Sequence, residues 1–180
     1  MPSVSSRRRS ASASLLLEAV NAGAERVVVG LGGSGTNDGG AGLLAALGAS
    51  ADVALDVGGI FLEGVADVDL SIARGLVDGV EIVAATDVDN PLTGLFGATK
   101  TFGPQKGLDE EMQVLLDGYL EQWAAATDRR LALEPGAGAA GGIGFALLLL
   151  GGHRVSGIES GRRGGRPGPA GSHRRPGAHR

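Results

Sequence analysis

Cysteine is absent from the 180-residue sequence, and histidine and aromatic residues are scarce. Without cysteine the protein has no disulfide bond, no catalytic thiolate and no cysteine-ligated zinc site. The three histidines all lie from residue 153 onward, so a Ser-His-Asp triad and a histidine-ligated metal site are excluded from the body of the chain. Aromatic residues make up 3% of the sequence, whereas glycine occupies 33 positions, well above its usual share of about 7%.

Charge is distributed unevenly along the chain. Residues 1–9 contain three arginines and no acidic residue, and residues 151–180 contain seven arginines and one glutamate. The segment between them, residues 10–150, holds 19 acidic and six basic residues. An acidic body of this kind argues against a nucleic-acid-binding domain.

Both ends of the chain have the composition of disordered segments. Residues 1–14 are rich in serine and arginine, and residues 159–180 contain no Val, Ile, Leu, Met or aromatic residue. Such segments cannot offset their ordering entropy by burying apolar surface. We therefore predict a disordered basic head over 1–14 and a disordered Arg/Gly/Pro tail over 159–180. An RNA-binding role for the tail is the functional alternative.

The sequence predicts neither a secretory signal nor a membrane span. Residues 1–14 lack the apolar core of a signal peptide. The longest uncharged stretch, residues 136–152, begins in glycine and is shorter than the roughly 20 apolar residues that a spanning helix needs. We therefore predict a cytoplasmic protein without membrane contact.

Apolar strand patterns alternate with helical patterns between the two ends. The β-branched run over residues 26–31 predicts a strand buried on both faces, and residues 81–86 predict a second buried strand. Apolar spacing over residues 108–126 predicts the clearest helix. Shorter helices are predicted over residues 15–22, with Ser14 as N-cap and Gly23 as the C′ residue, and over residues 41–47, 59–65 and 143–150. This order favours an α/β fold with a mainly parallel sheet and flanking helices.

The first candidate site is the glycine-rich loop over residues 32–40, between the first strand and a helix. Glycines allow tight turns and close approach to a ligand, and free N–H groups at a helix start favour an anion. The candidate anion-binding residues of this loop are Gly33, Ser34, Thr36, Asn37 and Asp38. Asp38 could also act as a base or as a magnesium ligand. The alternative is a plain tight turn with Asn37 or Asp38 as the helix N-cap.

The second candidate site is the acidic loop over residues 86–92, directly after the second strand. Ligands of α/β proteins bind beyond the carboxyl ends of parallel strands. Asp87, Asp89 and Asn90 offer oxygen ligands for Mg²⁺ or a base that activates a hydroxyl. The alternative is a turn before Pro91 that is stabilised by one of these side chains.

Two further segments offer positive charge and backbone N–H groups. Lys106, one of only two lysines, lies in the loop over residues 102–107 and can reach a phosphate or a carboxylate. A solvated loop lysine is the alternative. The Gly/Ala segment over residues 135–142, which includes Gly138, offers N–H groups at a helix start, or else permits close helix–sheet packing. Together these features favour phosphoryl transfer, which depends on positioning and charge neutralisation.

Three long motifs occur in a defined order. They are GLGGSGTNDGGAGLLAALGA at residues 30–49, ATDVDNPLTGLFGATKTFGPQKG at 85–107 and EPGAGAAGGIGFALL at 134–148. In order and spacing they resemble the central portion of the glycerate kinase family, the type I bacterial D-glycerate kinases. The segment LLLEAVNAGAERVVVG before the first motif is also family-like. The resemblance covers residues 15–159.

The resemblance implies part of a two-domain α/β fold and an ATP- and Mg²⁺-dependent kinase. The substrate would be D-glycerate and the product phosphoglycerate, most often the 2-phospho isomer. The loop over residues 33–38 would cradle the substrate carboxylate or the nucleotide phosphates. Asp87 and Asp89 would hold Mg²⁺ or accept the hydroxyl proton, with Asn90 orienting the group, and Lys106 would neutralise charge on the transferred phosphoryl group. Which aspartate is the base stays open.

The chain departs from the family at both ends. The family's Asp-Ser-Phe-Lys-Gly and Thr-Gly-Glu-Gly-Arg-x-Asp segments are absent, and the chain turns into its Arg/Gly/Pro tail at Ser160. These departures predict a partial domain over residues 15–158 that lacks N- and C-terminal segments and self-associates through exposed sheet edges. The alternatives to an active kinase are a catalytically incompetent truncated or frameshifted fragment and a dinucleotide-binding module that binds NAD. The glycine loop fits the dinucleotide fingerprint poorly.

Overall fold

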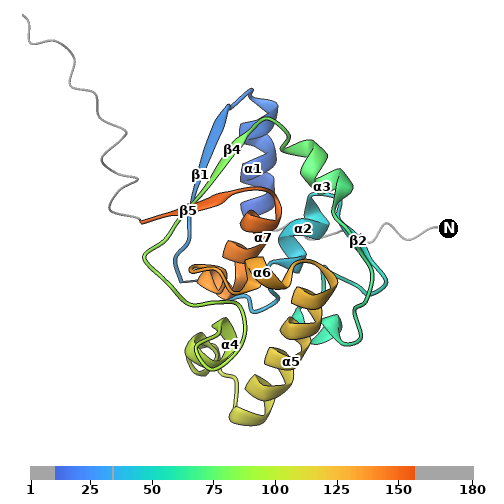
Figure 1. The fold of residues 1–180 in the computed structure, drawn as a ribbon. Helices are drawn as coiled ribbons and strands as arrows, with labels where there is room; N and C mark the ends of the chain where they lie inside the picture. Colours follow the sequence, from blue (N-terminus) through green and yellow to red (C-terminus); the bar gives the residue numbers. More distant parts are fainter. Residues whose placement is uncertain (1–10, 34, 157–180) are drawn as a thin grey trace, which may run out of the picture.

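A parallel sheet of three strands forms the centre of the computed structural model, which describes residues 11–33 and 35–156 (Figure 1). Its strand order is β1 (Arg26–Gly30), β4 (Glu81–Ala85) and β5 (His153–Val155). A separate antiparallel pair joins β2 (Ser50–Ala51) to β3 (Val68–Asp69). Ser34, most of the predicted head and the predicted tail lie outside the described residues.

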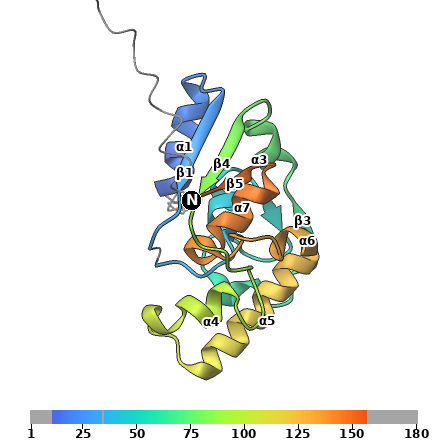
Figure 2. The ribbon, with the colours of Figure 1, turned by 60° about the vertical axis from the view of Figure 1, so that its left-hand side comes forward.

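Helices surround the sheet and extend below it in the view of Figure 1. The α-helices are α1 (Ala11–Asn21), α2 (Ala41–Ala46), α3 (Ser71–Leu76), α4 (Ala98–Phe102), α5 (Glu110–Ala126), α6 (Arg129–Ala132) and α7 (Ile143–Leu149). Three short 3₁₀ segments are η1 (Gly59–Leu62), η2 (Pro104–Lys106) and η3 (Ala139–Gly142). Helix α7 packs against β4 and β5, and α1 packs against α2. Figures 1 and 2 agree that α4 and α5 lie together at one end of the molecule. The α/β prediction is confirmed.

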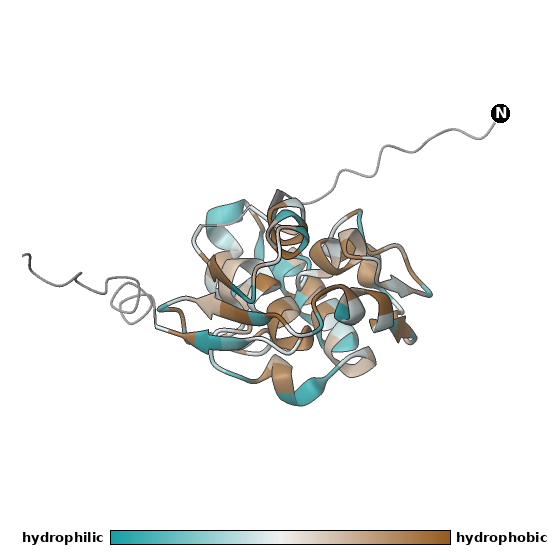
Figure 3. Cartoon of the chain, turned by 90° about the horizontal axis from the view of Figure 1, so that it is seen from above, coloured by the Kyte–Doolittle hydropathy of each residue, from teal (hydrophilic) through white to brown (hydrophobic). Residues whose placement is uncertain are grey.

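The core lies between the central strand and the helices. β4, the central strand, is buried from Ile82 onward, and helix α7 packs against it. Helix α5 begins at Glu110, two residues after the predicted start, because Asp109 is its N-cap and the Asp109 carboxylate accepts the N–H of Met112 at 2.8 Å. It buries Leu116, Tyr119, Leu120 and Trp123, whereas Leu115 is 41% exposed. In Figure 3 the brown apolar segments occur on helices and strands alike, mainly in the middle of the molecule, whereas teal segments lie mainly toward its outside.

Two local predictions are wrong. β1 is not buried on both faces: its exposure alternates and Val28 is 50% exposed, so the face that carries Arg26 and Val28 is not covered. β1 is also an edge strand, with β4 on one side only among the described residues. Ser14 is not an N-cap, since α1 already begins at Ala11. Gly23 does end that helix in the left-handed conformation expected of a C′ residue, with φ 81°. Within the described ranges no helix is long and apolar enough to cross a membrane.

The β1 edge leads to a test of self-association. An edge strand presents unpaired backbone groups, and a lysine on such a strand opposes pairing with another chain. We expect the wild-type chain to form concentration-dependent oligomers and Val28→Lys to shift it toward the monomer in sedimentation velocity. Val114→Lys is the matched control, because Val114 is an exposed valine on α5. Equal effects of both variants, or a monomeric wild type, would contradict edge pairing.

Candidate active site

The carboxyl ends of the parallel strands place two of the candidate loops at one edge of the sheet. β1 and β4 pair in register from Arg26 opposite Glu81 to Gly30 opposite Ala85. Pairing continues beyond the strands, since the N–H of Leu31 donates to the carbonyl of Ala85 at 3.0 Å. The glycine loop after β1 and the acidic loop after β4 therefore leave the sheet side by side.

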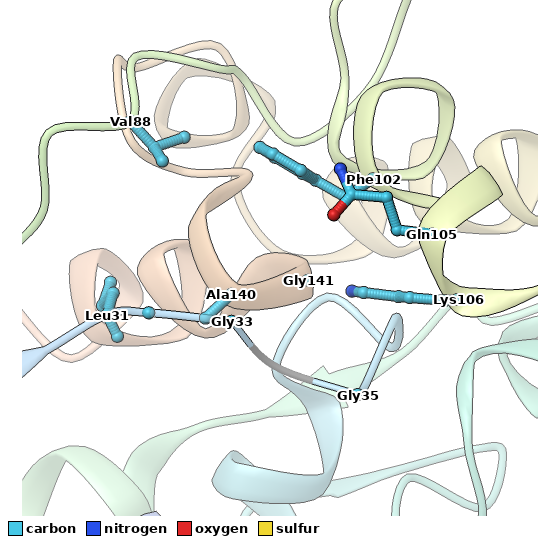
Figure 4. A pocket seen from close by; sticks show the side chains of 10 residues that line it. Leu31, Gly33, Gly35, Val88, Phe102, Gln105, Lys106, Ala140 and Gly141 are labelled. Atoms are coloured by element: carbon cyan, nitrogen blue, oxygen red, sulfur yellow. The ribbon is translucent and has the colours of Figure 1, made fainter.

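A cavity of about 460 Å³ opens between these loops (Figure 4). It is lined by the loop after β1, the loop after β4, the α4–η2 region and η3. The lining residues are Leu31, Gly32, Gly33, Gly35, Val88, Phe102, Gln105, Lys106, Ala140 and Gly141. All four segments identified from the sequence therefore contribute to the cavity wall. The acidic loop contributes a single residue, Val88.

Close backbone packing explains the glycines of the segment before α7. A Cβ on Gly141 would collide with the carbonyl oxygen of Thr36, and Gly141 has φ 72°. A Cβ on Gly138 would collide with the carbonyl oxygen of Pro91. Gly138 therefore permits close packing of main chain on main chain. Its N–H donates to the Asn90 carbonyl at 2.9 Å. Ala140, in the cavity wall, has φ 52°, a left-handed conformation that costs a non-glycine residue energy and occurs preferentially at functional sites.

Lys106 crosses the cavity from η2 toward the glycine segments. Figure 4 shows its ammonium group next to Gly141, and this group donates a hydrogen bond to the Thr36 carbonyl. Burial lowers the pKa of Lys106 from its ordinary value of 10.5, and the nearby Asp38 carboxylate offsets part of that decrease. The interpretation as a solvated loop lysine does not describe this half-buried position.

Asp38 organises the start of α2. Its two carboxylate oxygens accept the N–H groups of Gly40 at 3.0 Å and of Gly42 at 3.2 Å. The predicted alternative, Asn37 or Asp38 as the N-cap, is wrong in position because the N-cap of α2 is Gly40, but Asp38 still accepts N–H groups at the start of the helix. The negative charge of this carboxylate also lies near Lys106, where it favours the protonated form of the amine.

The acidic loop turns its two carboxylates toward β5. Val88 lines the cavity, whereas Asp87 accepts a hydrogen bond from the Ser156 hydroxyl at 2.7 Å and Asp89 lies 2.6 Å from the Arg154 guanidinium. The loop begins with a turn in which the Thr86 hydroxyl accepts the N–H of Val88 at 3.1 Å. The aspartates therefore lie beside the cavity, and Val88 between them forms its wall.

The two asparagines attach their loops to α4. The Asn37 amide donates to the Thr99 hydroxyl at 3.0 Å, and the Asn90 amide donates to the Thr101 hydroxyl at 3.1 Å and to the Phe96 carbonyl at 2.7 Å. Sequence reasoning missed this helix and its threonines. A signal existed in the threonines spaced two apart between the acidic loop and Lys106, but nothing local marks them as partners of asparagines in two other loops.

A buried carboxylate fixes the segment that leads into α4. Asp117 of α5 accepts the N–H of Gly94, with both oxygens at 3.3 Å, and lies 3.8 Å from the Lys100 ammonium. Burial raises the pKa of Asp117, and these two partners oppose the increase. The arrangement holds α4 against α5 and thereby positions Phe102 and the start of η2 at the cavity.

The aspartates do not fit a metal ion held by the protein alone. Within the described part of the chain no group of three or more His, Cys, Asp or Glu residues could hold a metal ion. Asp89 is already paired with Arg154 at 2.6 Å, which disfavours it as a ligand. The assignment of Mg²⁺ to Asp87 and Asp89 stays a prediction.

Comparison with known proteins gives a consistent result. A sequence model described as the glycerate kinase family matches residues 8–160. The chain is 44% identical to a glycerate kinase of Bacillus cereus and 44% identical to the glycerate 2-kinase of Escherichia coli K12, each over 81% of this chain and 40% of the relative. It also resembles the crystal structure of a protein described as glycerate kinase 2 from Salmonella typhimurium LT2, with TM-score 0.76 and 42% identity over 83% of this chain and 42% of that one. The chain thus spans about 40% of the length of these relatives.

Proposed function

The chain belongs to the glycerate kinase family, and from this we propose that its cavity is the phosphate-binding part of a site that transfers a phosphoryl group from ATP to D-glycerate. The observation that carries the proposal is the convergence of the two glycine-rich segments and Lys106 on one cavity. Backbone N–H groups and an ammonium ion are the groups that bind phosphate oxygens in nucleotide sites.

Lys106 would neutralise charge on the phosphoryl group. Its ammonium is held between Thr36 and Gly141, so it is positioned before a ligand arrives and less entropy is lost on binding. Gly33 and its neighbours Gly32 and Gly35 leave the main chain accessible, because a Cβ at any of these positions would have open space around it. Thr36 and Asn37 continue this loop: the Thr36 carbonyl accepts the hydrogen bond from Lys106, and the Asn37 amide donates to the Thr99 hydroxyl.

Asp87 is the aspartate that we assign as proton acceptor. Asp38 accepts two backbone N–H groups and Asp89 is paired with a guanidinium, whereas Asp87 is the direct neighbour of Val88, which lines the cavity, and one of its contacts is the Ser156 hydroxyl. In the proposed reaction the glycerate hydroxyl oxygen forms a bond to the γ-phosphorus as the bond to the β–γ bridging oxygen breaks. The hydroxyl proton passes to the Asp87 carboxylate, and the products are ADP and 2-phosphoglycerate. Mg²⁺ bound to the nucleotide would neutralise phosphate charge.

A coupled ADP-release assay with ATP and D-glycerate tests the proposal, with ATP alone as the blank. We expect glycerate-dependent ADP release that Asp87→Asn reduces by roughly 10²-fold or more, the usual contribution of a positioned base. Absence of both turnover and ATP binding would overturn the proposal, as would full activity of Asp87→Asn.

Binding without turnover is the second candidate function. It is favoured by the share of the relatives that the chain spans, about 40% of their length, because residues on the remaining part could complete the site. In this case calorimetry would detect ATP binding while the coupled assay stays at the blank rate. The two measurements therefore separate an active kinase from a nucleotide-binding domain.

The pH dependence of ATP binding should follow Lys106. Only the protonated amine attracts phosphate, and burial lowers its pKa below 10.5. Affinity should therefore fall as the pH rises through this lowered pKa, in a window that begins below pH 10.5. Lys106→Arg should keep its affinity across the window, because arginine stays protonated. Calorimetric titrations of both proteins from about pH 7 upward check this expectation, and identical pH profiles would contradict it. The stability contribution has the opposite sign: the unfolded lysine holds its proton to higher pH, so stability rises across the same window.

A further inference from the structure

Trp123 is a fully buried side chain that does not line the cavity, yet it hydrogen-bonds to the loop that does. It is the only tryptophan in the chain and has 0% exposure. Its indole N–H donates to the carbonyl oxygen of Gly39 at 3.2 Å. The two residues are 84 positions apart, so this bond ties α5 to the glycine loop after β1.

The contact continues from Gly39 to the cavity. The N–H of Gly39 donates to the Gly141 carbonyl at 3.1 Å, so the peptide groups around Gly39 join Trp123 to the segment before α7. At Gly141 a Cβ would lie 2.9 Å from the Lys106 ammonium nitrogen and would collide with the Thr36 carbonyl. The position of Gly141 therefore sets the space available to the Lys106 head group.

The contact between Gly39 and Trp123 is tightly packed. Gly39 has φ 64°, and a Cβ there would lie 2.7 Å from Cδ1 of Trp123. A Cβ on Gly142 would collide with the Gly39 main chain. Main chain thus packs directly on main chain and on the indole ring. A change in the Gly39 carbonyl must be transmitted to residues 141–142, because no side chain lies between them to absorb it.

We propose that Trp123 is a positioning residue for the cavity, acting through Gly39 and Gly141 to hold Lys106 where it meets a phosphate group. The inference rests on the proposed function in one respect, that the ligand of the cavity is a phosphate. The physical reason is that loss of the indole N–H leaves the buried Gly39 carbonyl without its donor, which is costly enough to shift the loop. The competing interpretation is that Trp123 contributes to core packing alone.

An isosteric replacement separates these two interpretations. β-(3-Benzothienyl)alanine has the shape of tryptophan with sulfur in place of the N–H, and in a tryptophan auxotroph it enters this chain at position 123 only. 5-Fluorotryptophan, which keeps the N–H, is the matched control. We expect the sulfur analogue to retain a cooperative unfolding transition and to bind ATP roughly five- to tenfold more weakly. The fluorinated protein should bind ATP like the wild type.

A ligand-free measurement keeps the inference independent of the proposed function. The chain has two lysines, Lys100 and Lys106, so ¹³Cε labelling of lysine gives two NMR signals that Lys100→Arg assigns. The Lys106 titration should move in the sulfur analogue, and the Lys100 titration should not. If wild-type protein fails to bind ATP but the Lys106 titration moves, the positioning role stands and the proposed function fails.

An unchanged ATP affinity and an unchanged Lys106 titration in the sulfur analogue would overturn the positioning role, whatever happens to the melting temperature. Trp123→Phe is the second variant, because it removes the N–H by ordinary mutagenesis, although it also leaves a cavity in the core. Tyr119→Phe controls for loss of a polar group from the same buried face of α5. It should leave both the affinity and the Lys106 titration at their wild-type values.

Discussion

Gly141→Ala is expected to abolish ATP binding and to destabilise the fold by about 3 kcal/mol or more. Two costs add up in this variant. A left-handed φ of 72° costs an L-residue about 1–2 kcal/mol, and overpacking typically adds about 1–3 kcal/mol. The new methyl group would meet the Thr36 carbonyl and the Lys106 ammonium, so relief of the clash must separate the groups that form the cavity. Chemical denaturation and calorimetric ATP titration check the two effects.

Gly79→Ala is the matched control for Gly141→Ala. Gly79 also has a left-handed φ, 75°, but a Cβ there has nothing within 4 Å. It lies between α3 and β4, outside the cavity wall. This variant should lose about 1 kcal/mol through backbone strain alone and should bind ATP normally. If the two alanine variants were equally stable and bound ATP equally well, close main-chain packing at Gly141 would have no role in the site.

Lys106→Met is expected to weaken ATP binding by roughly 10- to 100-fold while the fold is retained. A hydrogen bond to a charged group contributes about 1.5–3 kcal/mol, and each 1.4 kcal/mol corresponds to about a tenfold change in affinity. Methionine keeps most of the apolar stem of Lys106, which lines the cavity together with Phe102 and Gln105. Calorimetry with ATP gives the affinity, and thermal unfolding confirms that the variant is folded.

Arg130→Met is the control for the charge removed by Lys106→Met. Arg130 lies on α6, is exposed and does not line the cavity. Removing its charge changes the net charge of the protein equally, so it reports any general effect on the attraction of an anionic nucleotide. We expect less than a twofold change in affinity. Equal weakening in both variants would show that Lys106 acts only through the overall field.

Local chemistry alone predicts much of the fold. The apolar run before Gly30 and the run from Glu81 to Ala85 are strands because β-branched and small apolar residues favour the extended, pleated backbone of a sheet. Helix α5 follows from its apolar spacing and from the Asp109 cap. Strand β5 escaped prediction because its three residues, His153 to Val155, include two polar side chains and acquire strand geometry by pairing with β4.

The candidate site also has features that the sequence predicts and features that depend on tertiary contacts. The two glycine-rich segments and Lys106 are visible in the sequence because they depend on residue type, and the structure brings them to one cavity. The different roles of Asp38, Asp87 and Asp89 depend on partners that are distant in the chain or belong to the turn of a neighbouring helix.

What the sequence by itself determined is the α/β alternation, the glycine segments and the family membership, because each is written in neighbouring residues. Only the tertiary structure decided that the acidic loop presents Val88 to the cavity, that α4 is held by two asparagines, and that Trp123 contacts Gly39. Hydrogen bonds and close packing act over a few ångströms of space, whatever the separation along the chain. Their partners become definite only when the strands have set which loops meet.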